Sequence, residues 1–291
     1  MRMAFKKGKT MKTSRPGLIA GMACMVLSAA LGAGCRGKGA AQRVTLVGST
    51  SVQPFAEVLA EEYQKRNPDI QVTVQGGGSG QGIQALAKGI ADIGTCSRDL
   101  SDEEKATLTP NVIARDGLAI VVHPDNPIKG LTRQQVQDIF AGKIANWKDV
   151  GGADHAVAVV LREDGSGTRE AFTHLIMGKV PCSRNAMVQG SNGAIKALVR
   201  ANPNAVGYMS LGQAKGELKA VDMDGVTPTE AGVARGEYKL WRPFLFVTRG
   251  TPGPEAAKFI EFALSPAGQR ILEKEGLVGA ASAATSAPEA K

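Results

Sequence analysis

Aromatic residues, histidines and cysteines are scarce in this chain of 291 residues: aromatics make up 4% of it, with three histidines and four cysteines. No stripe of lysine and arginine is interleaved with aromatics, which argues against a nucleic-acid-binding surface. His123, His155 and His174 occur at no spacing typical of a metal site or a catalytic triad. The sequence therefore predicts no metal, no cofactor and no nucleic-acid partner.

The cysteines are too few for a disulfide framework. Cys35 follows Leu31-Gly32-Ala33-Gly34, which is similar to a lipoprotein processing box with its large aliphatic residue displaced by one position. We expect lipidation at Cys35; Cys24 is the weaker candidate, because cleavage there would leave half of the apolar segment attached. Cys96 and Cys182 are expected to be small buried residues rather than a bridged pair.

The basic character of the chain resides mostly in its N-terminal segment. The first 34 residues hold six lysines and arginines and no acidic residue, and they end in an uncharged stretch from Pro16 to Gly34. This pattern is typical of an export signal. Without those six residues the formal net charge falls from +8 to about +2. We therefore expect residues 1–34 to be a lipoprotein signal peptide. The mature chain would be exported and lipid-anchored on the outer side of the cell membrane, or periplasmic.

The nucleotide-binding motifs and the serine-hydrolase motif are also missing. Residues 76–82 lack the third glycine of G-x-G-x-x-G at the required spacing, and no G-x-x-x-x-G-K-[ST] occurs. Ser79 and Ser166 do not form a G-x-S-x-G elbow, because Gln81 and Asp164 stand where glycines are needed. Nucleotide binding and serine-hydrolase chemistry are disfavoured, and we expect no enzyme.

Short apolar runs alternate with segments of helical period, which predicts an α/β fold. The expected strands are 44–47, 70–74, 91–94, 118–122, 156–161, 206–209 and 244–248. The expected helices lie around 55–63, 83–90, 136–140, 172–176, 195–199 and 254–274, the last broken near Ser265-Pro266.

The length suits two lobes rather than one minimal core. Proline-containing segments at 123–127 and 240–243 are the predicted crossovers, and two crossing segments make a hinge. Lobe one would comprise residues 43–123 and 241–278, and lobe two residues 124–240. A tether over 35–42 and a low-complexity, disordered tail over 279–291 would flank them.

Three stretches place glycine and hydroxyl residues just before an expected helix: residues 48–51, 76–82 and 162–169. A helix start presents unpaired N–H groups, and glycine lets a ligand approach them closely. The third stretch adds Arg162, whose planar fork of donors fits a tetrahedral oxyanion. Ser97 and Arg98 follow another strand and are expected at the same edge of the sheet. Together these turns predict an anion site.

The candidate ligand residues share a hydroxyl, a guanidinium or a close-approach glycine: Thr50, Ser51, Ser79, Ser97, Arg98, Arg162, Ser166, Gly167 and Thr168. For any single serine of this set, helix capping is an ordinary alternative role. Arg98 can instead pair with Asp99 or Asp102 at the surface.

Residues 162–168, Arg-Glu-Asp-Gly-Ser-Gly-Thr, resemble the phosphate loop of the PstS-type phosphate-binding proteins of bacterial ABC importers, within the periplasmic-binding-protein superfamily. Residues 48–54 and 78–82 are similar to the other two ligand turns of that family, and the resemblance extends over residues 44–278. It implies a two-lobed type II fold that closes on inorganic phosphate and delivers it to membrane permease subunits, acting as a monomer.

By the same resemblance, Arg162, Ser166, Gly167 and Thr168 contact phosphate, and Asp164 holds the arginine. The longer members of the family have an aspartate acceptor near the position of Ser97, where this chain reads Ser97-Arg98-Asp99 as in the shorter branch. Two candidates thus remain for accepting the ligand's proton, Asp164 and Asp99. An aspartate facing the ligand would favour protonated phosphate over sulfate.

Three alternatives stay open at this point. The nearest is a receptor for another tetrahedral oxyanion, such as sulfate, molybdate or tungstate. An exported hydrolase of phosphoesters and a signalling or adhesion module that retains the fold are the others.

Overall fold

The structure is a computed structural model, and it describes residues 42–280. The predicted signal peptide, the lipidation site Cys35, the tether up to residue 41 and the tail from residue 281 lie outside the described residues. Within residues 42–280, every helix falls short of the length and apolar character needed to cross a membrane.

A mixed sheet forms the framework, with strand order β2-β1-β3-β11-β4-β8-β6-β7. Its strands are β1 (Gln42–Gly48), β2 (Ile70–Gly76), β3 (Ile93–Cys96), β4 (Leu108–Val122), β6 (Ala158–Arg162), β7 (Met187–Gln189), β8 (Ala205–Ser210) and β11 (Trp241–Arg249). Two short strands, β9 (Lys219–Ala220) and β12 (Val278–Gly279), also pair with β4, and β5 (Gly130–Leu131) pairs with β10 (Asp222–Met223).

The helices lie between these strands in the sequence. They are α1 (Gln53–Arg66), α2 (Ser79–Ala87), α3 (Asp102–Lys105), α4 (Arg133–Phe140), α5 (Gly167–Phe172), α6 (Asn192–Ala201), α7 (Leu211–Ala214), α8 (Glu230–Ala234), α9 (Pro254–Leu264) and α10 (Pro266–Lys274). A 3₁₀ turn spans Trp147–Val150, and a π-helical turn, Thr173–Met177, continues α5.

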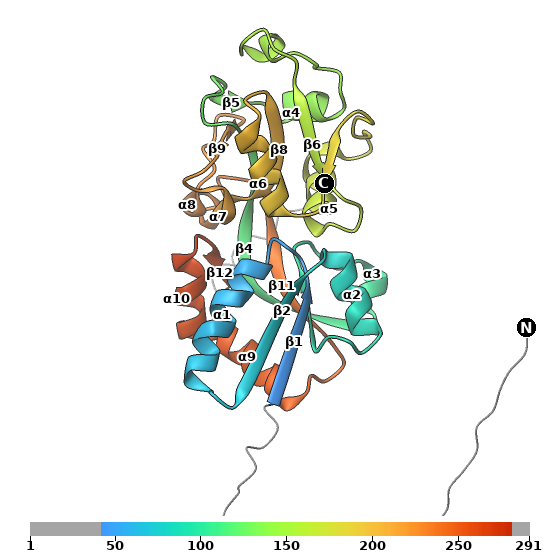
Figure 1. Cartoon of the computed structure of the whole chain (residues 1–291), viewed down its shortest axis with the longest axis vertical. Helices are drawn as coiled ribbons and strands as arrows, with labels where there is room; N and C mark the ends of the chain where they lie inside the picture. The colour runs from blue at the N-terminus through green and yellow to red at the C-terminus, as the bar shows by residue number, and fades with distance from the viewer. Residues whose placement is uncertain (1–41, 281–291) are drawn as a thin grey trace, which may run out of the picture. The chain divides into compact units, whose positions relative to one another are not determined.

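Strand β4 is shared by two lobes. From Leu108 to Gly117 it pairs with β11, and from Leu118 to Val122 it pairs with β8, both antiparallel. Figure 1 shows β4 passing from the part that holds β1 and β2 into the part that holds β6 and β8. The sequence predicted only the apolar second segment, because proline and charged residues interrupt the pattern of the first.

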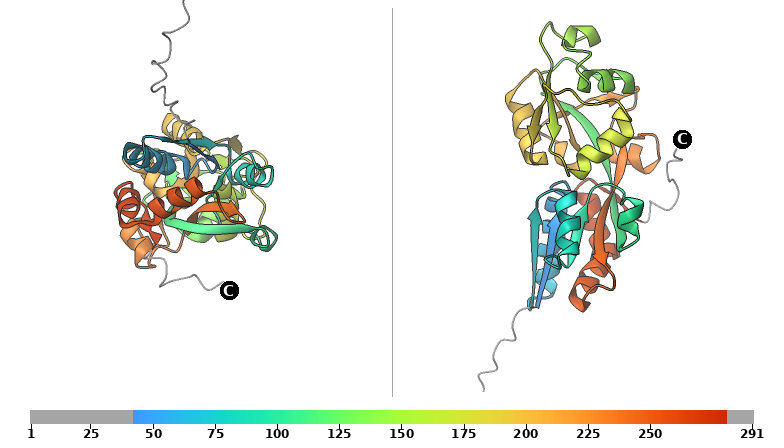
Figure 2. Two further views of the ribbon diagram at one scale, coloured as in Figure 1. Left: turned by 90° about the horizontal axis from the view of Figure 1, so that it is seen from below. Right: turned by 90° about the vertical axis from the view of Figure 1, so that its right-hand side faces the viewer.

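In lobe one, alternate residues of β11 face opposite sides of the sheet, as the period of a strand requires. Phe244 and Phe246 pack with α9, whereas Leu245 and Val247 pack with Leu86 of α2. Helices α9 and α10 lie in the same part of the molecule as β1 in Figure 1 and in the right-hand view of Figure 2. Both faces of this sheet are thus buried.

Lobe two repeats this arrangement around the end of β4. Leu118, Ile120 and Val122 belong to a core that includes α4 and α5, and Ala119 and Val121 belong to a second core with α6. The α/β class and the two-lobed organisation are confirmed.

The lobe boundaries differ from the prediction at two places. Leu118–Val122 was assigned to lobe one, but it pairs with β8 and lies in the lobe-two cores, so the packing favours a boundary at Leu118 rather than after His123. Gly279 was assigned to the tail, yet in β12 it pairs with Ala114. The second predicted crossover coincides with the start of β11, where Trp241 is paired with Gly117.

Candidate functional site

Polar turns from both lobes converge where strands end. In lobe one, β1, β2 and β3 end at Gly48, Gly76 and Cys96, directly before the predicted turns; in lobe two, β6 ends at Arg162. Ligands of open α/β sheets gather at such carboxyl ends. The predicted turns therefore lie where a ligand site is expected.

These turns, together with Asn192 of α6 and Gln213 of α7, build what we call the interlobe polar cluster: Thr50, Ser51, Ser79, Ser97, Arg162, Thr168, Asn192 and Gln213. Six of its members are at most 1% exposed, namely Ser51, Ser79, Ser97, Arg162, Thr168 and Asn192. Buried polar groups are costly unless hydrogen-bonded, so their mutual bonding is required.

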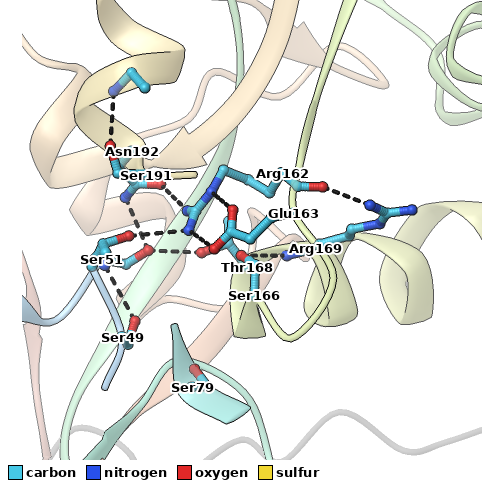
Figure 3. Close-up of polar contacts among 12 residues, drawn as sticks. Ser49, Ser51, Ser79, Arg162, Glu163, Ser166, Thr168, Arg169, Ser191 and Asn192 are labelled. Atoms are coloured by element: carbon cyan, nitrogen blue, oxygen red, sulfur yellow. Dashed lines mark hydrogen bonds and ion pairs between the residues drawn. The ribbon is translucent and has the colours of Figure 1, made fainter. Parts of the chain in front are cut away.

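Five hydrogen bonds join the lobes directly in this region, two of them from Asn192 and Gln213 to Ser51; Figure 3 shows those between Ser51, Thr168 and Asn192. Ser51 Oγ lies 2.7 Å from Thr168 Oγ1, and Arg162 Nη2 donates to Thr50 Oγ1 at 3.1 Å. The backbone N–H of Gly80 donates to the carbonyl of Gly165 at 3.0 Å. The lobes are therefore closed on one another at the predicted ligand turns.

Ser79 and Ser97 form the lobe-one wall of the cluster. The backbone N–H of Ser97 donates to Ser79 Oγ at 3.2 Å, and the two hydroxyl oxygens lie 3.5 Å apart. Gly167 of lobe two lies directly against them, because a Cβ there would overlap the Ser79 hydroxyl and come within 2.9 Å of Ser97 Oγ. Only glycine fits at this contact without displacing a neighbour.

Arg162 is the cation of the cluster, and Glu163 holds it. Nε and Nη2 of Arg162 each donate to the Glu163 carboxylate at 2.8 Å, a bidentate pair, and Nη1 donates to Asn192 Oδ1 at 2.9 Å. With the bond to Thr50, these contacts use four of the five N–H groups of a guanidinium. The arginine is thus fixed in orientation before any ligand arrives.

Asn192 and Gln213 were missed by the sequence analysis. Asn192 Nδ2 donates to Ser51 Oγ at 2.9 Å and to Gln213 Oε1 at 3.3 Å, and Gln213 Nε2 donates to the Ser51 carbonyl at 2.6 Å. A signal was present for the asparagine, since residues 190–193 read Gly-Ser-Asn-Gly at the start of α6. Nothing local distinguishes Gln213.

Tyr208 contacts the backbone of Arg162 and packs on Phe172. The backbone N–H of Arg162 donates to the Tyr208 hydroxyl at 3.1 Å, and the Tyr208 ring stacks on Phe172 with centroids 4.0 Å apart. Burial raises the pKa of Tyr208 well above its ordinary value, so the phenol stays neutral. A rigid aromatic layer therefore underlies the end of β6.

Asp164 does not hold Arg162, contrary to the prediction. Its side chain is 95% exposed and lies 3.0 Å from Arg169 Nη1. Glu163, which is 26% exposed, thus faces the cluster, whereas Asp164 faces solvent. Ser166 also has a local role, because its hydroxyl caps α5 by accepting from the backbone N–H of Arg169 at 3.3 Å.

Arg98 and Asp99 also depart from the prediction. Arg98 forms a bidentate pair with Glu104 at 2.7 and 2.9 Å, and its Nε lies 2.6 Å from Glu170 Oε2. Its charge is directed at carboxylates rather than at the cluster. Burial raises the pKa of Glu170, an effect that Arg98 opposes. Asp99 is exposed, at the rim of a separate cavity, so neither predicted proton acceptor faces the cluster.

No group of three or more histidine, cysteine, aspartate or glutamate side chains within residues 42–280 is arranged to hold a metal ion. Cys96 and Cys182 are free cysteines, Cys96 buried and Cys182 partly so. The chemistry of the cluster is therefore that of hydrogen-bond donors around one cation.

The family model described as the PBP superfamily domain matches residues 36–267. The phosphate-binding protein PstS of Bacillus subtilis is 32% identical over 243 residues, which cover 81% of this chain and 80% of that protein. PstS of Borreliella burgdorferi is 29% identical over 267 residues, covering 87% and 96%.

Among solved structures, a putative phosphate ABC transporter substrate-binding protein with bound phosphate from Clostridium perfringens is 41% identical, with a TM-score of 0.80, covering 82% of this chain and 99% of that one. An ABC-type phosphate transport receptor from Vibrio cholerae is also 41% identical, with a TM-score of 0.68 over 81% and 99%. From the family model and these likenesses, the chain belongs to the PstS-type phosphate-binding proteins of the PBP superfamily.

Proposed function

We propose that this chain captures inorganic phosphate in the interlobe polar cluster and delivers it to the permease of an ABC importer. The observation that carries the proposal is the convergence of hydroxyl and amide groups from both lobes around the buried Arg162, in a chain of this family. It binds its ligand and does not transform it chemically. The names of its relatives, which are binding proteins, support this.

The cluster has the donors that a phosphate ion needs. The hydroxyls of Ser51 and Thr168 bond to one another across the lobes, and Thr50 accepts from Arg162. A phosphate entering between the lobes would exchange these bonds for bonds to its own oxygens, with Arg162 supplying a charge-assisted one. Ser79, Ser97 and the backbone at Gly167 would complete the shell from the opposite side.

Glu163 takes the positioning role that the sequence analysis gave to Asp164. It orients Arg162 through two bonds of 2.8 Å, and its Oε1 would lie 3.5 Å from a Cβ on Gly78 of lobe one. Because it neutralises the arginine, recognition of the anion rests on directional hydrogen bonds more than on net charge. A carboxylate at this place also disfavours a ligand that carries no proton, such as sulfate.

The remaining parts of the proposal concern the whole protein. The mature chain would be lipid-anchored through Cys35 on the outer side of the cell membrane and act as a monomer. Its lobes would move about the two segments that cross between them, at Leu118 in β4 and at Trp241, where β11 begins.

Isothermal titration calorimetry of the mature chain with phosphate, sulfate, molybdate and tungstate tests this function. We expect one phosphate per chain and much weaker binding of the other three anions. Tighter binding of any of these would assign a different oxyanion, and no binding of any would favour a signalling or adhesion role. Turnover of a chromogenic phosphate ester would contradict a pure binding function.

A further inference from the structure

Arg98 makes a contact between the lobes that lies outside the interlobe polar cluster. Arg98 follows β3 in lobe one, and Glu170 lies on α5 in lobe two. Nε of Arg98 is 2.6 Å from Glu170 Oε2. In Figure 1, α3 lies in the lower part of the molecule and α5 in the upper part. This ion pair exists only while the lobes are together.

Glu104 fixes the arginine for that contact. It accepts two hydrogen bonds from Arg98, at 2.7 and 2.9 Å, and it is itself held by the backbone N–H of Ser101, which donates to its carboxylate at 2.9 Å. The Arg98 and Glu104 side chains are 13% and 19% exposed, whereas Glu170 is 44% exposed. An arginine already held in place loses little side-chain entropy when it meets its second partner.

The pair is close to the proposed ligand site along the chain but separate from it in space. Arg98 directly follows Ser97, and Glu170 comes two residues after Thr168. Arg98, Glu104 and Glu170 line a cavity of about 740 Å³ that none of the eight members of the interlobe polar cluster lines. A change in the pair can therefore act on closure without removing a ligand contact.

We infer that Arg98 and Glu170 form an interlobe latch that slows the release of bound phosphate, with Glu104 as the residue that positions Arg98. The inference rests on the proposed function. It assigns to Arg98 a role in closure instead of the ligand contact expected from the sequence. Breaking the latch makes opening easier, so its effect falls on the dissociation rate more than on the association rate.

One feature separates a latch from a purely structural pair. Two carboxylates share the single guanidinium of Arg98, so removing its charge leaves Glu104 and Glu170 facing each other in the closed form. Arg98→Gln should therefore harm closure more than Glu170→Gln. Adding Glu170→Gln to Arg98→Gln should recover part of the loss, because the repulsion disappears.

The test measures phosphate affinity by calorimetry and release by stopped-flow tryptophan fluorescence, on the parent chain and on three variants: Glu170→Gln, Arg98→Gln and the double variant. We expect Glu170→Gln to release phosphate about three to ten times faster with an unchanged association rate. The difference should shrink in high salt, which screens a partly exposed pair. Glu103→Gln removes a neighbouring exposed carboxylate that does not contact Arg98, and should behave like the parent.

Two results would overturn the latch while leaving the proposed function intact. One is a parent that binds phosphate beside a folded Glu170→Gln variant with the same release rate. The other is a double variant at least as impaired as the product of the single effects, which would indicate a direct ligand contact of Arg98. A parent that fails to bind phosphate would overturn the proposed function, and the latch with it.

Discussion

Gly167 of lobe two lies against Ser79 of lobe one so closely that no side chain fits between them. A Cβ on the glycine would overlap the serine hydroxyl and come within 2.9 Å of the Ser79 Cβ. Each residue begins a helix, α5 and α2, and each is buried. Closure of the lobes therefore depends on the absence of one methyl group.

Gly167→Ala should weaken phosphate binding by about ten- to a hundredfold, because the added methyl group keeps the lobes from closing fully. Stability should change little, since the clash can be relieved by opening. Calorimetric titration and a thermal melt check both. Gly190→Ala is the matched control, because a Cβ at Gly190 has no atom within 4 Å and that variant should bind as the parent does. Equal affinity of the two variants would show that the lobes do not need this contact.

Arg162→Ala should lower phosphate affinity about thirtyfold or more, because it removes the only guanidinium of the cluster and leaves the Glu163 carboxylate unpaired. Circular dichroism establishes that the variant is folded, and calorimetry measures the loss. Unchanged affinity in a folded variant would exclude Arg162 from the site.

Asn192→Asp replaces the amide that donates to Ser51 with a carboxylate that accepts only. The bond from Arg162 to Oδ1 can persist, but a negative charge enters a site proposed for an anion. We expect at least a tenfold loss of phosphate affinity, and a smaller loss for Asn192→Ala, which adds no charge. A carboxylate variant that binds as well as the alanine variant would contradict the proximity of Asn192 to the ligand.

Asp116 and Arg242 form a buried ion pair where β4 and β11 cross between the lobes. Nη2 of Arg242 lies 3.0 Å from Asp116 Oδ2, and Ser210 Oγ donates to Asp116 Oδ1 at 2.7 Å. The side chains of Arg242 and Asp116 are 2% and 0% exposed. Asp116→Asn leaves the arginine charge buried without its partner, and should lower the free energy of unfolding by about 3–5 kcal/mol. Urea denaturation measures this loss. A loss below about 1 kcal/mol would show that water solvates the Arg242 charge in the variant.

Glu104→Gln should give a pH-dependent loss of stability. Hydrogen bonds from Arg98 lower the pKa of Glu104 below its ordinary value of 4.5. A carboxyl group with a lowered folded-state pKa adds stability above its unfolded pKa, and this is lost as pH falls through the folded value. We expect a loss of about 1 kcal/mol at neutral pH for this partly exposed group, and the difference should disappear as the pH falls below the ordinary pKa of 4.5.

Denaturation of the parent and the Glu104→Gln variant at neutral and at acidic pH measures that difference. Glu261→Gln, at an exposed position of α9, serves as the control. A gap that stays constant with pH would mean that the glutamate stabilises the chain through packing alone.

The sequence predicted the strands and helices whose apolar residues keep a regular period, including the break between α9 and α10 at Ser265. It did not predict the first half of β4, because Arg115 and Asp116 interrupt the apolar pattern there while being buried. A buried charged residue can be predicted from the sequence only when its partner is known. The partner of Asp116 is Arg242, which lies more than a hundred residues away in the sequence.

The site, like the fold, was predictable only in part. Hydroxyls and glycines at strand ends indicated where a ligand site lies, because turn chemistry is local. Choosing between Glu163 and Asp164 as the partner of Arg162 depended on which way two adjacent side chains point, which the motif does not encode. The partners of Arg98 come from α3 and α5, so its role required the tertiary structure.

A crystal structure of the mature chain grown with phosphate tests the central claim most directly. We predict one phosphate ion enclosed by Ser51, Ser79 and Thr168, with Arg162 donating to it and Glu163 still holding the arginine. Phosphate bound elsewhere, for instance in the cavity beside Trp241, with the hydroxyls of the cluster still bonded to one another, would contradict the account.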